Sequence, residues 1–123
     1  MFNVKLKHKK EYISTMSNNK VLSKEENSDG TITTTFDKSP KMVTYLLAFV
    51  VSDFYCGKTT SSGGTNVQVC SSPPMKDMTS YALDISPRLL DTFGTKFNYN
   101  YSQMLPKIDI LAIPDFSAGK FLF

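Results

Sequence analysis

The spacing of the apolar residues changes at the Pro73-Pro74 pair, and this change limits the folds that the chain can adopt. Before the pair, apolar and polar residues alternate in short runs, which is the period of a β-strand. After it, apolar residues recur at every fourth position, which is the period of a helix. Since 123 residues provide room for one small domain but not for two complete ones, the sequence predicts a mainly β fold with one helix.

The first ten residues read as a strand that starts almost at once. One face is predicted to carry Phe2, Val4, Leu6 and His8, and the other face carries the lysines. A solvated basic face explains this pattern, and the alternative is a patch for an anionic partner. The net charge of +3 is too mild and too widely spread to indicate nucleic acid binding.

Four further segments before residue 73 are predicted to be extended. Asp29-Gly30 lies between two β-prone runs, 20–26 and 31–36, and predicts a hairpin in which Ile32 and Phe36 share a face. The apolar run within 42–54 favours a strand covered on both faces. A loop over 59–64, with Ser62-Gly63-Gly64 as a flexible tip, precedes a short strand over 66–70. We therefore expect antiparallel strands and no helix over residues 1–72.

The segment 75–97 is predicted to be a helix, and residues 107–113 a strand. The helix's apolar stripe comprises Tyr81, Ile85, Leu89, Phe93 and Phe97, with Ala82, Leu83 and Leu90 beside it. Pro87 falls within the pattern, so it either kinks the helix or marks the first turn of a helix capped by Ser86.

Candidate catalytic chemistry is sparse. His8 is the sole histidine, it lies in a strand, and it is interpreted as a surface or rim residue rather than as a base or a metal ligand. Cys56 and Cys70 flank the predicted loop; they either pair in a disulfide or stay apart, because a hairpin centred near Ser61 would place Ser52 opposite Cys70. Asn100-Tyr101-Ser102 is an acceptor pattern for N-glycosylation, provided that the chain enters the secretory pathway.

The two ends show neither a secretory leader nor a membrane anchor. The longest apolar run, 45–51, is much shorter than the ~20 residues that span a bilayer. The chain starts inside a strand pattern and stops inside an apolar run, so we expect it to be a piece of a larger protein.

Three stretches resemble the zinc aminopeptidases of the aminopeptidase N type, and most of all the insect membrane-bound members. They are 40–54, 81–93 and 106–119, in the order and spacing of that family. The resemblance implies that residues 1–74 are the C-terminal part of the N-terminal β domain, an antiparallel β-sandwich or saddle portion. It implies that residues 75–123 are the truncated start of a thermolysin-like α/β catalytic domain.

The resemblance also implies a site. Ser117, Ala118 and Gly119 would line the substrate cleft, with Gly119 as the first residue of the exopeptidase motif Gly-Ala-Met-Glu-Asn. In place of its last four residues the chain has Lys120-Phe121-Leu122-Phe123, so the Glu that would hold the substrate's α-amino group is missing. No catalytic residue and no metal ligand is expected in this chain; zinc belongs to the full-length family.

By the same resemblance, full-length relatives remove N-terminal amino acids from peptides at the cell surface or outside the cell. Any membrane association would run through segments absent here. This chain alone is expected to be inactive, because it lacks the zinc motif. The alternative from another class is a non-catalytic β-rich binding or interaction module, which the exposed strand edges and the basic strand would suit.

Overall fold

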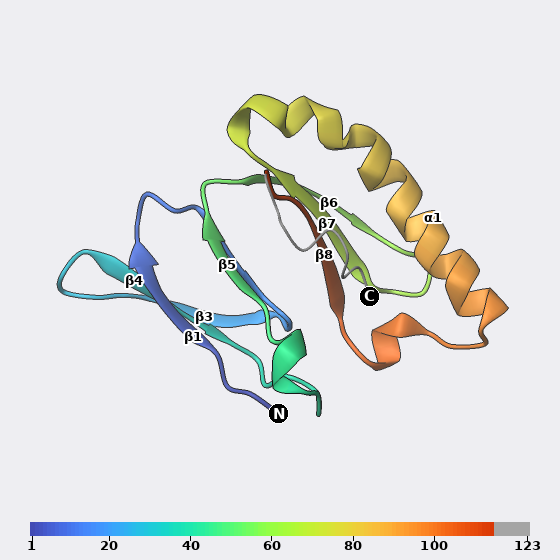
Figure 1. Cartoon of the computed structure of the whole chain (residues 1–123), viewed down its shortest axis with the longest axis horizontal. Coiled ribbons are helices and arrows are strands. Elements are labelled where there is room, and N and C mark those ends of the chain that lie inside the picture. The colour runs from blue at the N-terminus through green and yellow to red at the C-terminus, as the bar shows by residue number, and fades with distance from the viewer. Residues whose placement is uncertain (115–123) are drawn as a thin grey trace.

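The computed structural model describes residues 1–114, and its strands form three sheets (Figure 1). The first sheet has the order β1-β4-β3, the second pairs β2 with β5, and the third has the order β6-β7-β8. The strands are β1 (Lys5–Lys9), β2 (Ser14–Ser17), β3 (Val21–Glu26), β4 (Thr31–Phe36), β5 (Phe49–Ser52), β6 (Tyr55–Thr60), β7 (Asn66–Ser71) and β8 (Lys107–Ala112). The helices are α1 (Ser80–Lys96) and the short 3-10 segments η1 (Thr44–Leu46), η2 (Pro73–Thr79) and η3 (Tyr101–Gln103). The expectation of a mainly β fold with one α-helix near the C-terminal end is confirmed.

The predicted hairpin is the join between β3 and β4. Gly30 adopts a φ of +81°, a left-handed conformation that costs a glycine little, and its N–H donates to the carbonyl oxygen of Asn27 at 3.0 Å. The Asp29 carboxylate accepts a hydrogen bond from the ammonium of Lys7 on β1 at 2.7 Å, which holds the pKa of Asp29 well below its usual range. Phe36 is buried on the inner face of β4, as the alternation predicts.

His8 is buried, so its interpretation as a surface or rim residue is wrong. Its side chain points inward with Leu6, as the strand period requires, and only 8% of the residue is exposed. Nε2 lies 3.1 Å from the hydroxyl of Thr15 and 3.2 Å from that of Thr34, while Nδ1 lies 2.9 Å from the carbonyl oxygen of Lys9. His8 thus links β1, β2 and β4 through satisfied hydrogen bonds. The lysines of β1 face solvent, as predicted.

The apolar run at 42–54 does not form one doubly covered strand. It is divided into η1 and the short β5, which pairs only with β2 among the described residues. Tyr45 is 71% exposed and Phe49 is 61% exposed. Apolar content alone therefore misled the assignment, because a run of this length does not reveal whether neighbouring elements cover it.

The third sheet contains one strand that the sequence pattern concealed. β6 occupies 55–60, where the sequence suggested the start of a loop, and it pairs antiparallel with β7. β8 then pairs parallel with β7, so the chain must cross over between them through η2, α1 and η3. Figure 1 shows α1 lying along one side of this sheet.

Helix α1 packs on β6 and β7 through the flank of the predicted stripe, where Leu83 lies, rather than through the stripe itself. Leu83 meets the backbone at Gly57, where an added Cβ would lie 2.9 Å from Leu83 Cδ2. The predicted stripe points mostly away from the sheet, and Tyr81 is 75% exposed. Also exposed in that stripe are Leu89, Phe93 and Phe97.

The start and the interior of α1 refine the prediction. The helix begins at Ser80 rather than at residue 75, since η2 precedes it. It continues through Pro87, and Ser86 donates its hydroxyl proton to the carbonyl oxygen of Ala82. The alternative of a helix that starts at Pro87 and is capped by Ser86 is therefore wrong.

Strand β2 contacts both the first sheet and the third sheet. All four of its residues are buried, and Met16 on β2 lies against Cys70 on β7, with 3.7 Å between the two sulfur atoms. On its other side, Thr15 reaches His8 of the first sheet. The most buried apolar residues described are Met16, Phe36, Val67, Val69 and Cys70.

Candidate functional site

The predicted substrate-cleft residues Ser117, Ala118 and Gly119 lie outside the described residues. The structure does describe the strand that leads toward them. β8 pairs with β7 from Lys107 to Ala112, and Ile113 and Pro114 follow it. The predicted strand over 107–113 is thus confirmed for residues 107–112.

Strand β8 is anchored by a shielded ion pair. The ammonium of Lys107 contacts a carboxylate oxygen of Asp109, and the two side chains are 17% and 8% exposed. The same ammonium donates to the carbonyl oxygen of Ser17 on β2 at 2.8 Å. Burial, and then the negative charge of Asp109, raise the pKa of the Tyr101 phenol on η3. β8 is therefore held from two directions, by β7 and by β2.

A cavity of about 670 Å³ adjoins this ion pair, between β2 and β3 on one side and the third sheet on the other. Asp109 Oδ1 is buried there and has no hydrogen-bond partner among the described residues. The charged side chains of the lining are Asp109 with Lys20, Lys24, Lys58 and Lys107. The cavity is thus predominantly cationic, with one carboxylate oxygen still able to accept a hydrogen bond.

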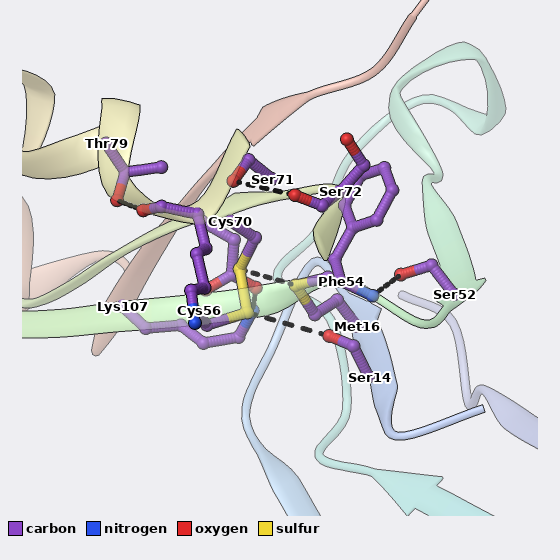
Figure 2. Close-up of a disulfide and its surroundings, with 12 residues drawn as sticks. Ser14, Met16, Ser52, Phe54, Cys56, Cys70, Ser71, Ser72, Thr79 and Lys107 are labelled. Carbon is purple, nitrogen blue, oxygen red and sulfur yellow. Dashed lines mark hydrogen bonds and ion pairs between the residues drawn. A yellow bond between two sulfur atoms is a disulfide. The ribbon is translucent and has the colours of Figure 1, made fainter. Parts of the chain in front are cut away.

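Cys56 and Cys70 form a disulfide, which resolves the alternative left open by the sequence (Figure 2). Cys56 faces Cys70 directly in the antiparallel pairing of β6 and β7. The expectation that Ser52 would face Cys70 is wrong, because the turn is centred on Gly63 rather than near Ser61. The Ser14 hydroxyl donates toward Cys56 Sγ at 3.6 Å, so β2 covers the bridge.

The loop between β6 and β7 is tied down, in contrast to the flexible tip predicted for it. The carboxylate of Asp91 on α1 accepts hydrogen bonds from the N–H groups of Ser62, at 2.8 Å, and Gly63, at 3.1 Å. These bonds, that of Ser62 foremost, lower the pKa of Asp91. The side chain of Asn100 donates to the carbonyl oxygen of Gly63 at 3.3 Å.

The described residues do not fit a metal ion. Within residues 1–114, no three His, Cys, Asp or Glu side chains converge as ligands would. His8 is enclosed by hydroxyl and carbonyl partners, and both cysteines are used in the disulfide. No mechanistic step can therefore be assigned to zinc on these residues. Among the helices of the described segment, none has the length and apolar character needed to cross a bilayer.

Comparison with known proteins places these features in a family. Residues 1–46 match the Peptidase M1 N-terminal domain. The chain is 36% identical over 118 residues to endoplasmic reticulum aminopeptidase 2 of Bos taurus and 38% identical over 118 residues to glutamyl aminopeptidase of Homo sapiens. Each of these alignments covers 96% of this chain and 12% of the relative. Puromycin-sensitive aminopeptidase of Caenorhabditis elegans is 36% identical over 109 residues, which are 88% of this chain and 11% of that protein.

The chain belongs to the M1 aminopeptidases, the family of the aminopeptidase N type. It spans about 12% of the length of the relatives that it matches over 118 residues. The resemblance to this family is thereby confirmed, whereas its closeness to the insect members stays a prediction.

Sequence reasoning missed three of the anchoring residues described above. Lys107 and Asp109 are two residues apart on an otherwise apolar strand, so they share a face, and this opposite-charge pair is a signal that could have been recognised. Asp91 gives no such signal, because its partners are backbone N–H groups almost thirty residues earlier. Only the three-dimensional packing of α1 on the third sheet brings them together.

Proposed function

We propose that this chain is a segment of a zinc metalloaminopeptidase that removes N-terminal amino acids from peptides. The observation that carries the proposal is the alignment with aminopeptidases over nearly the whole chain. In this proposal, residues 1–74 form the C-terminal part of the N-terminal β domain. Residues 75–123 form the start of the catalytic domain, with peptide substrates bound beyond β8.

Ser117, Ala118 and Gly119 are assigned to the lining of the substrate cleft, where their backbone would orient the peptide. The anchoring of β8 supports this assignment, because a strand fixed by β7 and by the Lys107 hydrogen bond to Ser17 gives the following residues a defined starting point. The role of these three residues is to position the substrate rather than to activate water.

The isolated chain is proposed to be inactive. Zinc in such an enzyme supplies a Lewis acid and a bound water of lowered pKa. The 123 residues contain a single histidine, and it is buried among hydroxyl groups, so they cannot build a ligand set based on two histidines. The metal would have to be held by residues of a longer polypeptide, as would the α-amino group of the substrate.

We place the protein in the secretory pathway, at the cell surface or outside the cell. The Cys56–Cys70 disulfide supports this location, because such bonds persist in oxidising compartments and are rare in the cytosol. Several of the relatives are named after the endoplasmic reticulum, which agrees with it. Membrane association, if the longer protein has it, would come from segments outside these residues.

The second candidate is a non-catalytic interaction module, and the exposed apolar stripe of α1 is the observation that favours it. Tyr81, Phe93 and Phe97 are too exposed to contribute to the core, so they are available to another protein surface. In the first proposal that surface is the remainder of a longer enzyme. Turnover by a folded chimaera of this chain with a longer aminopeptidase would favour the first candidate, whereas a folded chimaera without turnover would favour the second.

A pair of chimaeras tests the first proposal. In each, the aligned segment of human glutamyl aminopeptidase is replaced by this chain, either as residues 1–119 or as residues 1–123. We expect the 1–119 chimaera to hydrolyse an aminoacyl chromogenic substrate and the 1–123 chimaera to be inactive, because Lys120–Phe123 then displace the amine-binding Glu. A folded 1–119 chimaera without activity would contradict the proposal. Turnover by the isolated chain would contradict its predicted inactivity.

A further inference from the structure

We propose that Asn100 carries an N-linked oligosaccharide. The residue lies in the turn between α1 and β8, immediately before η3, and it is exposed. It opens the acceptor pattern Asn100-Tyr101-Ser102. Such patterns occur often by chance, so the proposal depends on the placement of the side chain and on the compartment, both of which the structure addresses.

The Asn100 side chain is held in a conformation that leaves its nitrogen available. Its Oδ1 accepts the backbone N–H of Ser102 at 3.0 Å and the Ser102 hydroxyl at 2.9 Å. Its Nδ2 makes one hydrogen bond, to the carbonyl oxygen of Gly63 at 3.3 Å. An amide nitrogen has two protons, so a sugar can replace one of them while the other remains a donor.

The surroundings of Asn100 have room for a sugar. A hollow of about 490 Å³ adjoins the residue, between the β6–β7 loop and the end of α1. Tyr99, which is 50% exposed, and Gln103 contribute to its lining. The first sugar residue would therefore meet an aromatic surface and polar groups without displacing a buried side chain.

The disulfide provides the second, independent observation. Cys56 and Cys70 are joined in a bridge that β2 covers, and such bridges form and persist in oxidising compartments. In eukaryotic cells the endoplasmic reticulum is both the place where disulfides form and the place where asparagine-linked sugars are added. A chain that acquires this bridge passes through the compartment that modifies Asn100.

The reaction is a glycosyl transfer from a lipid-linked oligosaccharide pyrophosphate. A bond forms between Asn100 Nδ2 and the anomeric carbon of the first sugar, and the bond between that carbon and the pyrophosphate oxygen breaks. The lipid pyrophosphate leaves with the electron pair, and Nδ2 releases one proton. No oxidant or reductant takes part, and the proposal is independent of the aminopeptidase activity.

The test is expression of the full 123-residue chain behind a secretory leader in eukaryotic cells, with total lysate and medium analysed together. Treatment with peptide-N-glycosidase should increase the gel mobility by the amount that corresponds to the loss of one glycan. It should also convert Asn100 to Asp, which peptide mass spectrometry detects. Ser102→Ala and Asn100→Gln should each abolish the shift, and Ser102→Thr should retain it. The chain without the leader should remain unmodified.

The disulfide serves as an internal control for delivery. If Cys56 and Cys70 are found bridged while Asn100 is unmodified, the chain has reached the oxidising compartment and the proposal is wrong. The glycosylated chain should also contain the disulfide, and it should melt like the enzymatically deglycosylated chain. If either result fails, the claim that the sugar fits the native turn is wrong. Neither outcome bears on the chimaera experiment, so the two proposals can fail separately.

Discussion

The ammonium group of Lys107 on β8 donates a 2.8 Å hydrogen bond to the backbone carbonyl oxygen of Ser17 on β2, ninety residues earlier in the chain. The same ammonium pairs with Asp109, whose side chain is more deeply buried than its own. One cation therefore satisfies a strand carbonyl and a shielded carboxylate together. Removing it leaves a buried negative charge uncompensated, which is the costly way to disrupt such a pair.

Lys107→Met is expected to lower the free energy of unfolding by about 3–5 kcal/mol, the usual cost of removing one partner from a buried pair. The double variant Lys107→Met/Asp109→Leu should recover a large part of that loss, because no charge is then left buried. Urea denaturation followed by circular dichroism measures both. Equal destabilisation by the single and the double variant would show that the pair is not shielded as the structure has it.

Gly57→Ala is expected to destabilise the contact between α1 and β6. The new Cβ would lie 2.9 Å from Leu83 Cδ2, and relieving this overlap should cost roughly 1 kcal/mol, because the end of a leucine side chain can move. In a Leu83→Ala background, Gly57→Ala should cost less than it does alone. A double-mutant cycle from denaturation midpoints gives the coupling, and a coupling of zero would place Leu83 elsewhere.

Reduction of the Cys56–Cys70 bridge is expected to reduce stability by about 3 kcal/mol, the loop-entropy estimate for a closed loop of this length. Cys56→Ser/Cys70→Ser should reproduce the effect, and a reductant should then have no further influence. The melting temperature with and without dithiothreitol provides the measurement. A wild-type melting temperature that does not respond to the reductant would indicate that the two thiols are not bridged.

The Asp91 contact should make stability depend on acid pH. Its pKa is lowered in the folded chain from the ordinary value of 3.8, so its stabilising contribution is complete above that value. The contribution is lost as the pH falls from there through the folded pKa, when the carboxylate is protonated. Asp91→Asn should therefore unfold more easily at neutral pH and approach the wild type once the pH falls below the lowered pKa of Asp91.

Asp29→Asn is the natural comparison for the Asp91 variant. The pKa of Asp29 is also lowered, chiefly by the Lys7 hydrogen bond. The contribution of Asp29 to stability is therefore also lost as the pH falls. Hydrogen exchange at Ser62 and Gly63 separates the two, since only the Asp91 variant should accelerate it. Unchanged exchange in Asp91→Asn would contradict the proposed anchoring of the loop.

The sequence was informative wherever a local pattern determines structure. Asp29-Gly30 indicated the hairpin because only a residue tolerant of a left-handed conformation closes that turn cheaply. The change of period after Pro73-Pro74 located the helix, although not its first residue. The alternation of residues 1–10 correctly pointed His8 inward, but its chemistry suggested a surface position, because its hydroxyl partners lie on other strands.

The errors arose where a distant partner decides the outcome. The stripe beginning at Tyr81 has helical spacing, yet α1 uses Leu83 to meet the sheet, and periodicity cannot say which of two neighbouring faces is covered. β6 was hidden because its Gly, Lys and Thr residues have the composition of a loop. The disulfide alignment depended on the centre of the turn, and a shift of two residues changes every cross-strand partner.

The parallel pairing of β7 with β8 has a practical consequence for anyone who divides this protein. A polypeptide that stops at residue 74 would keep β7 but lose its neighbour on one side, exposing a row of unsatisfied backbone groups ready to recruit another chain. Fragments meant for expression, crystallisation or domain exchange should therefore retain everything through Ala112. A polypeptide that stops at residue 74 is expected to aggregate into inclusion bodies.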